Sequence, residues 1–183
     1  FICWACMGTP YANYAVQESD FLIAIGSRFD DRVAGVPEKF APNAKVIAHF
    51  DVDPSEINKV KNAAWSHLGV LSTALRDLVK YAKNHDLELN FEDWVNHTHD
   101  LKKKYPLNFN RSSELIQPEH VIECINKITN GNAIVTTGVG QHQMWAAQYF
   151  DLKEPRLWLT SGSMGTMGFG IPAAIGAQFA HPE

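Results

Sequence analysis

The chain has 183 residues, of which 45% are hydrophobic and 20% charged, a composition that supports a buried core and excludes global disorder. Its net charge is −4 at pH 7 and it has no basic stripe, which argues against nucleic-acid binding. No apolar run is long enough to span a membrane, and Cys3, Cys6 and Cys124 lack the second ligand pair of a zinc site. Because the chain starts at Phe1 rather than Met, we expect an internal segment of a longer protein.

Helices and strands alternate along the first part of the chain. Thr9 and Pro10 are typical of a helix start. Apolar runs at residues 21–25 and 45–50 predict strands buried on both faces, as in parallel sheets. An amphipathic pattern predicts a helix over residues 71–83. These elements indicate an α/β domain, which we assign to residues 1–83.

Residues 84–116 differ in composition from the segments on either side. They are polar, rich in His and Asn, and interrupted by Pro106. Trp94, Val95 and Leu101 predict one helix within them. We interpret this stretch as a connector between two domains.

A second α/β domain is predicted over residues 117–183. Its helices are expected from Pro118 to Asn130-Gly131, over residues 141–149 and from Pro172 onward, with strands at residues 133–136 and 157–159. A glycine turn precedes the second of these helices and a glycine-rich loop precedes the third. Alternation of this kind predicts parallel sheets.

A polar run follows the first predicted strand, where open α/β sheets bind ligands. It consists of Gly26, Ser27, Arg28, Phe29, Asp30, Asp31 and Arg32. Glycine permits close approach of a ligand, and the two arginines carry forked donors for phosphate or carboxylate. A surface cluster of ion pairs is the alternative interpretation.

Two carboxylates end the next strand. Asp51 is placed to accept from a ribose hydroxyl, as the acid after this strand does in dinucleotide folds. Asp53, followed by Pro54, Ser55 and Glu56, has the pattern of a helix cap and first turn. We therefore assign Asp51 to a ligand and Asp53 to a cap. The opposite assignment, with Asp53 at the ligand and Asp51 structural, is the alternative.

Two glycine-containing stretches mark the second domain. Gly138, Val139 and Gly140 start like a dinucleotide fingerprint, but Gln143 replaces its third glycine, so an NAD site is disfavoured. A strand, glycine turn and helix still present N–H groups to an anion, beside Gln141 and His142. Residues 161–172 contain four glycines, with Met164 and Met167 suited to lining an aromatic cofactor. A packed connector is the alternative for that loop.

Together these stretches resemble the acetolactate synthase (acetohydroxyacid synthase) family of thiamine-diphosphate enzymes. The resemblance rests on residues 7–16, 26–32, 51–54, 138–148 and 165–176, in the family's order and near its spacing. The block Gln-His-Gln-Met-Trp-Ala-Ala-Gln at residues 141–148 is particular to this family. Met7 replaces the family's usual His, and Val70 stands where the family usually has Asp.

The resemblance implies a fold and a set of site residues. It implies part of a Rossmann-like FAD-binding middle domain, followed by the start of a thiamine-diphosphate domain. The implied cofactor-binding residues are Gly26, Ser27, Arg28, Phe29, Asp30, Asp31 and Asp51 for FAD, and Gln141, His142, Gly165, Thr166 and Met167 for thiamine diphosphate. Arg32 and Met167 are implied to act in catalysis, Arg32 on the substrate carboxylate and Met167 as an apolar support for the bent cofactor. The Mg²⁺ ligands and the catalytic Glu are implied to lie outside this chain.

The resemblance also implies an activity. Members decarboxylate pyruvate and ligate the two-carbon unit to pyruvate or 2-oxobutyrate, the first common step of branched-chain amino acid biosynthesis. It implies a homodimer or homotetramer with a possible small regulatory subunit, in the cytoplasm of bacteria or in plastids or mitochondria of eukaryotes. Glyoxylate carboligase, pyruvate oxidase and a non-catalytic nucleotide-binding module are the alternatives, and the isolated chain is expected to be inactive.

Overall fold

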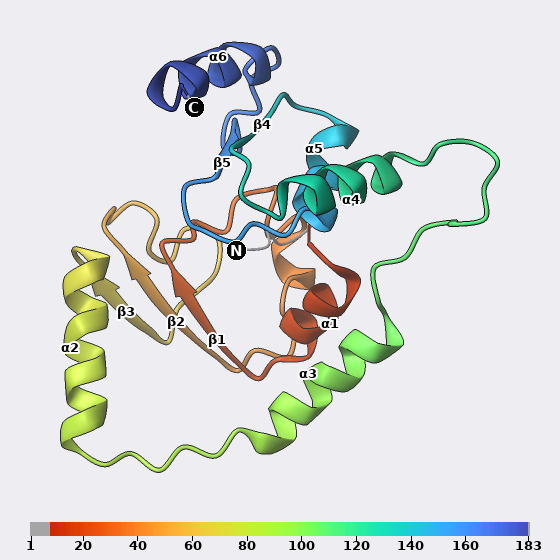
Figure 1. Ribbon diagram of the computed structural model, residues 1–183. Helices are drawn as coiled ribbons and strands as arrows, with labels where there is room; N and C mark the ends of the chain where they lie inside the picture. The colour runs from red at the N-terminus through yellow and green to blue at the C-terminus, as the bar shows by residue number, and fades with distance from the viewer. Residues whose placement is uncertain (1–7, 183) are drawn as a thin grey trace. The chain divides into compact units, whose positions relative to one another are not determined.

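The computed structural model describes residues 8–182, which form two compact units (Figure 1). One unit comprises residues 10–106, and the other comprises residues 107–182 with residues 8 and 9. Both are α/β units with parallel strands, which confirms the predicted class. Cys3 and Cys6 lie outside the described residues.

A three-stranded parallel sheet forms the centre of the first unit (Figure 1). It contains β1 (Phe21–Ile25), β2 (Val46–Asp51) and β3 (Trp65–Leu68) in that order. The predicted strands β1 and β2 are present, but β1 is an edge strand and one of its faces is exposed. The expectation that it is buried on both faces is therefore wrong. β3 was not predicted, because four residues of mixed polarity carry no clear strand pattern.

The helix α2 (Leu71–Asn84) packs through its first turn against β2 on one face of this sheet. Ala74 on the helix packs with Ala48 and Phe50 on β2, and Leu71 lies against this cluster. Leu71 on the predicted apolar side thus meets the sheet, whereas Leu78 and Val79 further along the helix are half exposed.

The opposite face of β2 is covered by the long connection between β1 and β2. Phe29 and Phe40 from this connection are buried, with ring centroids 5.7 Å apart in an edge-to-face arrangement. His49, whose side chain alternates in direction with its β2 neighbours, lies under Phe29 with ring centroids 5.2 Å apart. A small aromatic core therefore fixes the chain that follows β1.

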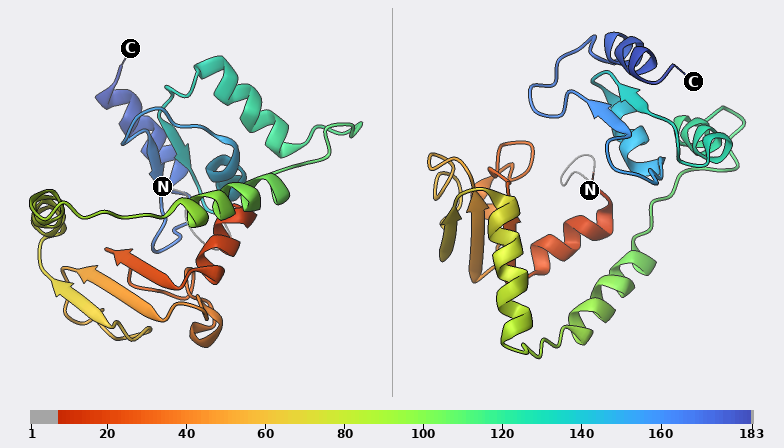
Figure 2. Two further views of the ribbon diagram at one scale, coloured as in Figure 1. Left: turned by 90° about the horizontal axis from the view of Figure 1, so that it is seen from below. Right: turned by 60° about the vertical axis from the view of Figure 1, so that its left-hand side comes forward.

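Two helices complete this unit and lie side by side (Figure 2). They are α1 (Pro10–Glu18) and α3 (Glu92–Lys104). Tyr14 on α1 stacks on Tyr105, which follows α3, at a centroid distance of 4.3 Å. His97 Nε2 lies 2.5 Å from Glu18 Oε2. The helix predicted within residues 84–116 is α3, and in the structure it packs in the same unit as the first sheet.

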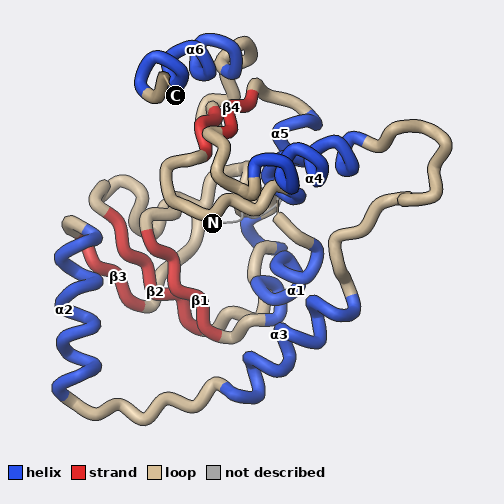
Figure 3. Tube along the Cα trace, in the orientation of Figure 1, coloured by secondary structure: helices blue, strands red, loops and turns tan. Residues whose placement is uncertain are grey.

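The second unit carries a two-stranded parallel sheet and three helices (Figure 3). The strands are β4 (Val135–Thr137) and β5 (Trp158–Thr160), and the helices are α4 (Pro118–Thr129), α5 (Gln141–Tyr149) and α6 (Gly170–Ala180). As predicted, α4 ends at Asn130 and Gly131, both of which have positive φ.

Two further expectations from the sequence are wrong. Residues 54–57 form a turn rather than a helix: the Asp53 carboxylate accepts from the Ser55 N–H, and Asn58 has a φ of 60° that stops helical continuation. The last helix begins at Gly170 rather than at Pro172. Proline is tolerated one turn into a helix because the first N–H groups have no partners within the helix.

Candidate functional site

The first candidate site lies at the carboxyl ends of β1, β2 and β3. Gly26 ends β1 with a φ of 63° and donates its N–H to the Phe50 carbonyl at 2.8 Å. Gly69 follows β3 and donates to the Asp51 carbonyl at 2.9 Å. These bonds bring the polar segments after β1 and β2, together with the glycine turn after β3, to one end of the sheet. The sequence predicts the first two of these segments as parts of a ligand site.

Asp30 lies in the loop that follows β1, and both of its carboxylate oxygens have partners in that loop. Its Oδ1 accepts from the Val33 N–H at 3.1 Å, and its Oδ2 pairs with the Arg28 guanidinium at 3.0 Å. Arg28 is half exposed, so this contact is the kind of surface pair that the alternative interpretation describes. Asp31 and Arg32 are exposed, and the described part of the chain offers neither an ion pair.

The remaining residues predicted in this segment differ in exposure. Phe29 is 3% exposed, and its backbone has a φ of 52°. Its buried ring therefore anchors the loop, and only its backbone can face a ligand. Ser27 is half buried and Gly26 is exposed.

Asp51 is buried at the end of β2, and its two carboxylate oxygens differ in their partners. Oδ1 accepts from the Val52 N–H at 2.7 Å and from the Asp53 N–H at 2.9 Å. Oδ2 lies 3.7 Å from His49 Nε2, beyond hydrogen-bond distance. Two backbone donors therefore hold one oxygen, and the other remains able to accept from a ligand hydroxyl.

The second candidate site joins the two glycine-containing stretches of the second unit. Gly138, His142, Gly168 and Gly170 line a hollow of about 410 Å³ together with Thr136, Ile171 and Ala174. The His142 ring folds back over the turn before α5, so a Cβ atom on Gly140 would lie 3.2 Å from His142 Nδ1. The structure thus brings together two stretches that the sequence singled out separately.

Gly170 permits the closest approach in this site. A Cβ atom there would lie 2.6 Å from the Gly138 nitrogen and 2.9 Å from the Thr137 carbonyl carbon. Such distances are shorter than side chains tolerate, so α6 can start against the end of β4 only because residue 170 is glycine. By contrast, a Cβ atom on Gly176 would meet no atom of the described residues within 4 Å.

Gln143 has a role that the sequence did not reveal. It is buried and donates from Nε2 to Thr160 Oγ1 at 2.7 Å, and Thr160 Oγ1 lies 2.6 Å from Thr137 Oγ1. The side chain that departs from the dinucleotide fingerprint therefore ties the first turn of α5 to β5. Only its spacing from Ala146, which is also buried on α5, could have indicated this inward position.

The other predicted residues of this site lie at its exposed margin. Gln141 and Thr166 are exposed, and Met167 is 80% exposed. Gly165 has a φ of 63°, and the Thr166 N–H donates to Ser161 Oγ at 2.9 Å, which shapes the loop. None of these residues lines the hollow described above.

The shifted pKa values of the second unit belong to Arg111 before α4, Glu123 on α4 and Tyr149 on α5. Arg111 forms a two-pronged pair with Glu123 at 2.7 and 2.8 Å, and this hydrogen bonding lowers the pKa of the Glu123 carboxyl. Burial, together with the negative charge of Glu119, raises the pKa of Tyr149. The Arg111–Glu123 pair fastens the chain before α4 to that helix.

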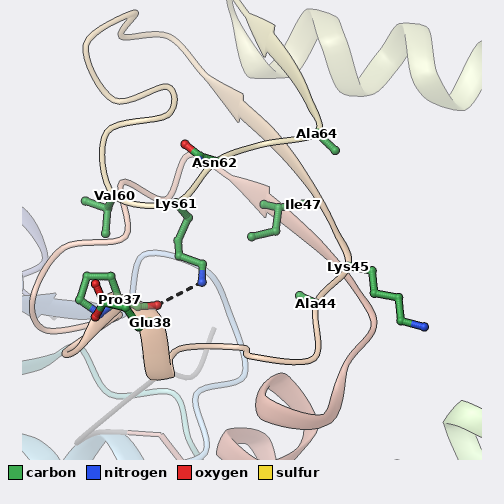
Figure 4. Close-up of a pocket in the computed structure, with 9 residues that line it drawn as sticks. All are labelled: Pro37, Glu38, Ala44, Lys45, Ile47, Val60, Lys61, Asn62 and Ala64. Atoms are coloured by element: carbon green, nitrogen blue, oxygen red, sulfur yellow. Dashed lines mark hydrogen bonds between the residues drawn. The ribbon is translucent and has the colours of Figure 1, made fainter.

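A further hollow, of about 300 Å³, lies at the amino-terminal side of β2 and β3 (Figure 4). Lys61 Nζ donates there to the Pro37 and Phe40 carbonyls at 3.1 and 3.0 Å. Lys61 thereby holds the short turn η2 (Pro37–Lys39) that carries Phe40 into the aromatic core. This hollow is at the opposite end of the strands from the first candidate site.

Residues 8–182 contain no cluster of three or more His, Cys, Asp or Glu side chains arranged to hold a metal ion. Within the same residues, every helix is too short or too polar to cross a bilayer.

Comparison with known proteins gives two matches to one enzyme family. Residues 2–78 match the central domain of thiamine pyrophosphate enzymes, and residues 138–183 match their C-terminal, thiamine pyrophosphate-binding domain. The chain belongs to the thiamine pyrophosphate enzyme family. The two candidate sites fall one in each of the matched domains.

Within the thiamine pyrophosphate enzyme family, the chain is similar to acetolactate synthases. It is 49% identical over 178 residues to the chloroplastic acetolactate synthase of Arabidopsis thaliana, and 49% identical over 178 residues to acetolactate synthase 1 of Nicotiana tabacum. It is 46% identical over 179 residues to the acetolactate synthase of Mycobacterium leprae. These alignments cover 96% of this chain and 26–28% of the relatives, so the chain spans about a quarter of their length.

Proposed function

We propose that the complete protein carrying this chain is an acetolactate synthase. It would decarboxylate pyruvate and ligate the two-carbon unit to a second 2-keto acid, either pyruvate or 2-oxobutyrate. The observation that carries the proposal is the 46–49% identity to acetolactate synthases along nearly the whole chain. This reaction would be the first common step of branched-chain amino acid biosynthesis.

The second candidate site is proposed to contribute to thiamine diphosphate binding. The glycine turn at Gly138–Gly140 and the first turn of α5 carry backbone N–H groups suited to a diphosphate, with Gln141 and His142 beside them. Residues 165–167 are proposed to receive the aminopyrimidine, and the exposed Met167 offers an apolar side chain for it to rest on. Thiamine diphosphate supplies the electron sink for decarboxylation. Mg²⁺ is proposed to be held by residues outside this chain.

The first candidate site is proposed to bind FAD in a Rossmann-like domain. Gly26, with its left-handed backbone, allows close approach, and Asp51 Oδ2 is open to a hydroxyl. Ser27, Arg28, Phe29, Asp30 and Asp31 are proposed to complete the contacts. We propose the domain division as 1–83 for the FAD-binding part, 84–116 for a connector and 117–183 for the thiamine diphosphate-binding part.

Arg32 is proposed to bind the carboxylate of the incoming 2-keto acid. Its guanidinium is exposed two residues after the Arg28–Asp30 pair and is free of ion pairs within residues 8–182. A planar fork matches a carboxylate with two parallel hydrogen bonds, which orients the substrate for carbon–carbon bond formation.

The complete protein is also proposed to form a homodimer or homotetramer. Its proposed location is the cytoplasm of a bacterium, or a plastid or mitochondrion of a eukaryote.

Product analysis on the complete gene product tests the proposal. Pyruvate should yield carbon dioxide and acetolactate, and added 2-oxobutyrate should yield 2-aceto-2-hydroxybutyrate. Tartronate semialdehyde from glyoxylate would instead identify a glyoxylate carboligase, and acetyl phosphate with peroxide would identify a pyruvate oxidase. Failure to release carbon dioxide from either pyruvate or glyoxylate in the presence of thiamine diphosphate, Mg²⁺ and FAD would leave only a nucleotide-binding module.

A further inference from the structure

His49 is a buried polar side chain without hydrogen bonds in the described part of the chain. It is 0% exposed in the middle of the first sheet, and neither Nδ1 nor Nε2 has a partner there. Burial of an unsatisfied imidazole costs free energy that an apolar ring of similar size would avoid. The packing of β2 therefore does not by itself explain a histidine at this position.

The surroundings of His49 connect two segments of the first candidate site. Its ring meets the edge of Phe29, which belongs to the loop after β1, at a centroid distance of 5.2 Å. Its Nε2 faces Asp51 Oδ2, after β2, at 3.7 Å. A shift of about 1 Å would bring these two atoms to hydrogen-bond distance. His49 thus lies beneath both the loop and the carboxylate that are proposed to meet the ligand.

The partners of Asp51 show which of its atoms such a bond would control. Oδ1 already accepts from two backbone N–H groups, so it is committed to the turn that follows β2. Oδ2 is left for His49 and for a ligand, and a carboxylate oxygen can accept from both at once. A donor behind Oδ2 would hold the carboxylate plane in one orientation while the ligand hydroxyl engages its other lone pair.

We propose that His49 is a positioning residue for Asp51. In the ligand-bound protein the His49 Nε2–H donates to Asp51 Oδ2 and orients this carboxylate toward a hydroxyl of the bound nucleotide. The inference rests on the proposed FAD site and adds to it a residue that lies behind the ligand-contacting surface.

Flavin binding by two variants of different chemistry tests this role. The complete gene product would be freed of flavin, and FAD affinity measured by quenching of flavin fluorescence. His49→Phe keeps an aromatic ring but removes the donor, and should weaken FAD binding about tenfold or more. His49→Gln can place its amide N–H near the position of Nε2 and should restore affinity to within a few-fold of wild type. The flavin-free His49→Phe protein should melt no lower than wild type, because the unsatisfied nitrogens are gone.

The outcomes separate this inference from the proposed function. If wild type binds FAD and Asp51→Asn weakens that binding, but His49→Phe binds as wild type does, the positioning role is wrong and the FAD site stands. Equal losses of affinity and of melting temperature in His49→Phe and His49→Gln would also overturn it, since they would indicate a purely structural role. A wild-type protein without FAD affinity would overturn the proposed site and the role of His49 together.

Discussion

The contact between Gly170 and the end of β4 can be tested with a single methyl group. In Gly170→Ala the new Cβ atom would lie 2.6 Å from the Gly138 nitrogen and 2.9 Å from the Thr137 carbonyl carbon, both of which are backbone atoms. Backbone cannot move aside as a flexible side chain does, so we expect the overpacking cost of about 1–3 kcal/mol. For a cooperative unit of about 150–250 residues, that cost lowers the melting temperature by roughly 2–12 °C. Thiamine diphosphate affinity should fall as well, because the displaced backbone belongs to the turn beside His142.

Gly176→Ala is the matched control, since it adds the same methyl group to the same helix. A Cβ atom there meets nothing within 4 Å, and alanine favours a helix interior over glycine by about 1 kcal/mol. Melting temperature and cofactor affinity of Gly176→Ala should therefore equal or exceed those of wild type. The measurements are differential scanning fluorimetry and a thiamine diphosphate titration of the complete gene product. If Gly170→Ala melts and binds as wild type does, or if both variants lose equally, the close approach does not constrain the site.

Three other features are tested by substitution, the first with a matched control. Lys61→Met removes the Nζ donor to the Pro37 and Phe40 carbonyls and should lower the free energy of unfolding by about 1.5–3 kcal/mol. The control Lys59→Met removes a surface pair with Glu56 and should lower it by under about 1 kcal/mol. Thermal unfolding measures both, and equal shifts in the two variants would contradict the role of Lys61. The Glu123 pKa is lowered in the folded state, so its stabilising contribution is present above pH 4.5 and disappears as the pH falls through the lowered value. Glu123→Gln should therefore melt below wild type at pH 7, with a difference that vanishes in acid, and a persistent difference would refute the assignment. Arg32→Lys should retain FAD and reduce acetolactate formation about ten- to a hundred-fold in favour of acetaldehyde. Loss of flavin with an unchanged product ratio would make Arg32 structural.

Regular elements and strand-end motifs could be predicted from the sequence because their signals are local. Apolar runs locate β1 and β2, and the pair Asn130-Gly131 ends α4 where the left-handed conformation is observed. The glycine turn before α5 is likewise visible in a few consecutive residues. In each case neighbouring residues carry the information, so no tertiary contact is needed to interpret it.

The features that were missed depend on residues distant in sequence. His49 is notable only because Phe29 and Asp51 surround it, and Gly170 only because it meets Gly138. The segment at Asp53 has the composition of a helix start, yet the left-handed backbone at Asn58 ends it as a turn. The contacts of His49 with Phe29 and of Gly170 with Gly138 join segments that are far apart in the sequence. The turn after Asp53 is instead decided locally, by residues that a helix start shares, so composition does not distinguish the two outcomes.

The parallel pairing of β1 with β2 has a consequence for the kinetics of folding. Every pair in this ladder, from Phe21 with Val46 to Ile25 with Phe50, joins residues separated by the whole intervening connection. The chain must therefore close that loop, and lose the corresponding entropy, before any ladder hydrogen bond forms. Phe29 and Phe40 can pack together while the loop is still closing, and their contact would shorten the effective search. Truncation of either ring should consequently slow refolding, whereas truncation of exposed side chains such as Val52 should leave the refolding rate unchanged.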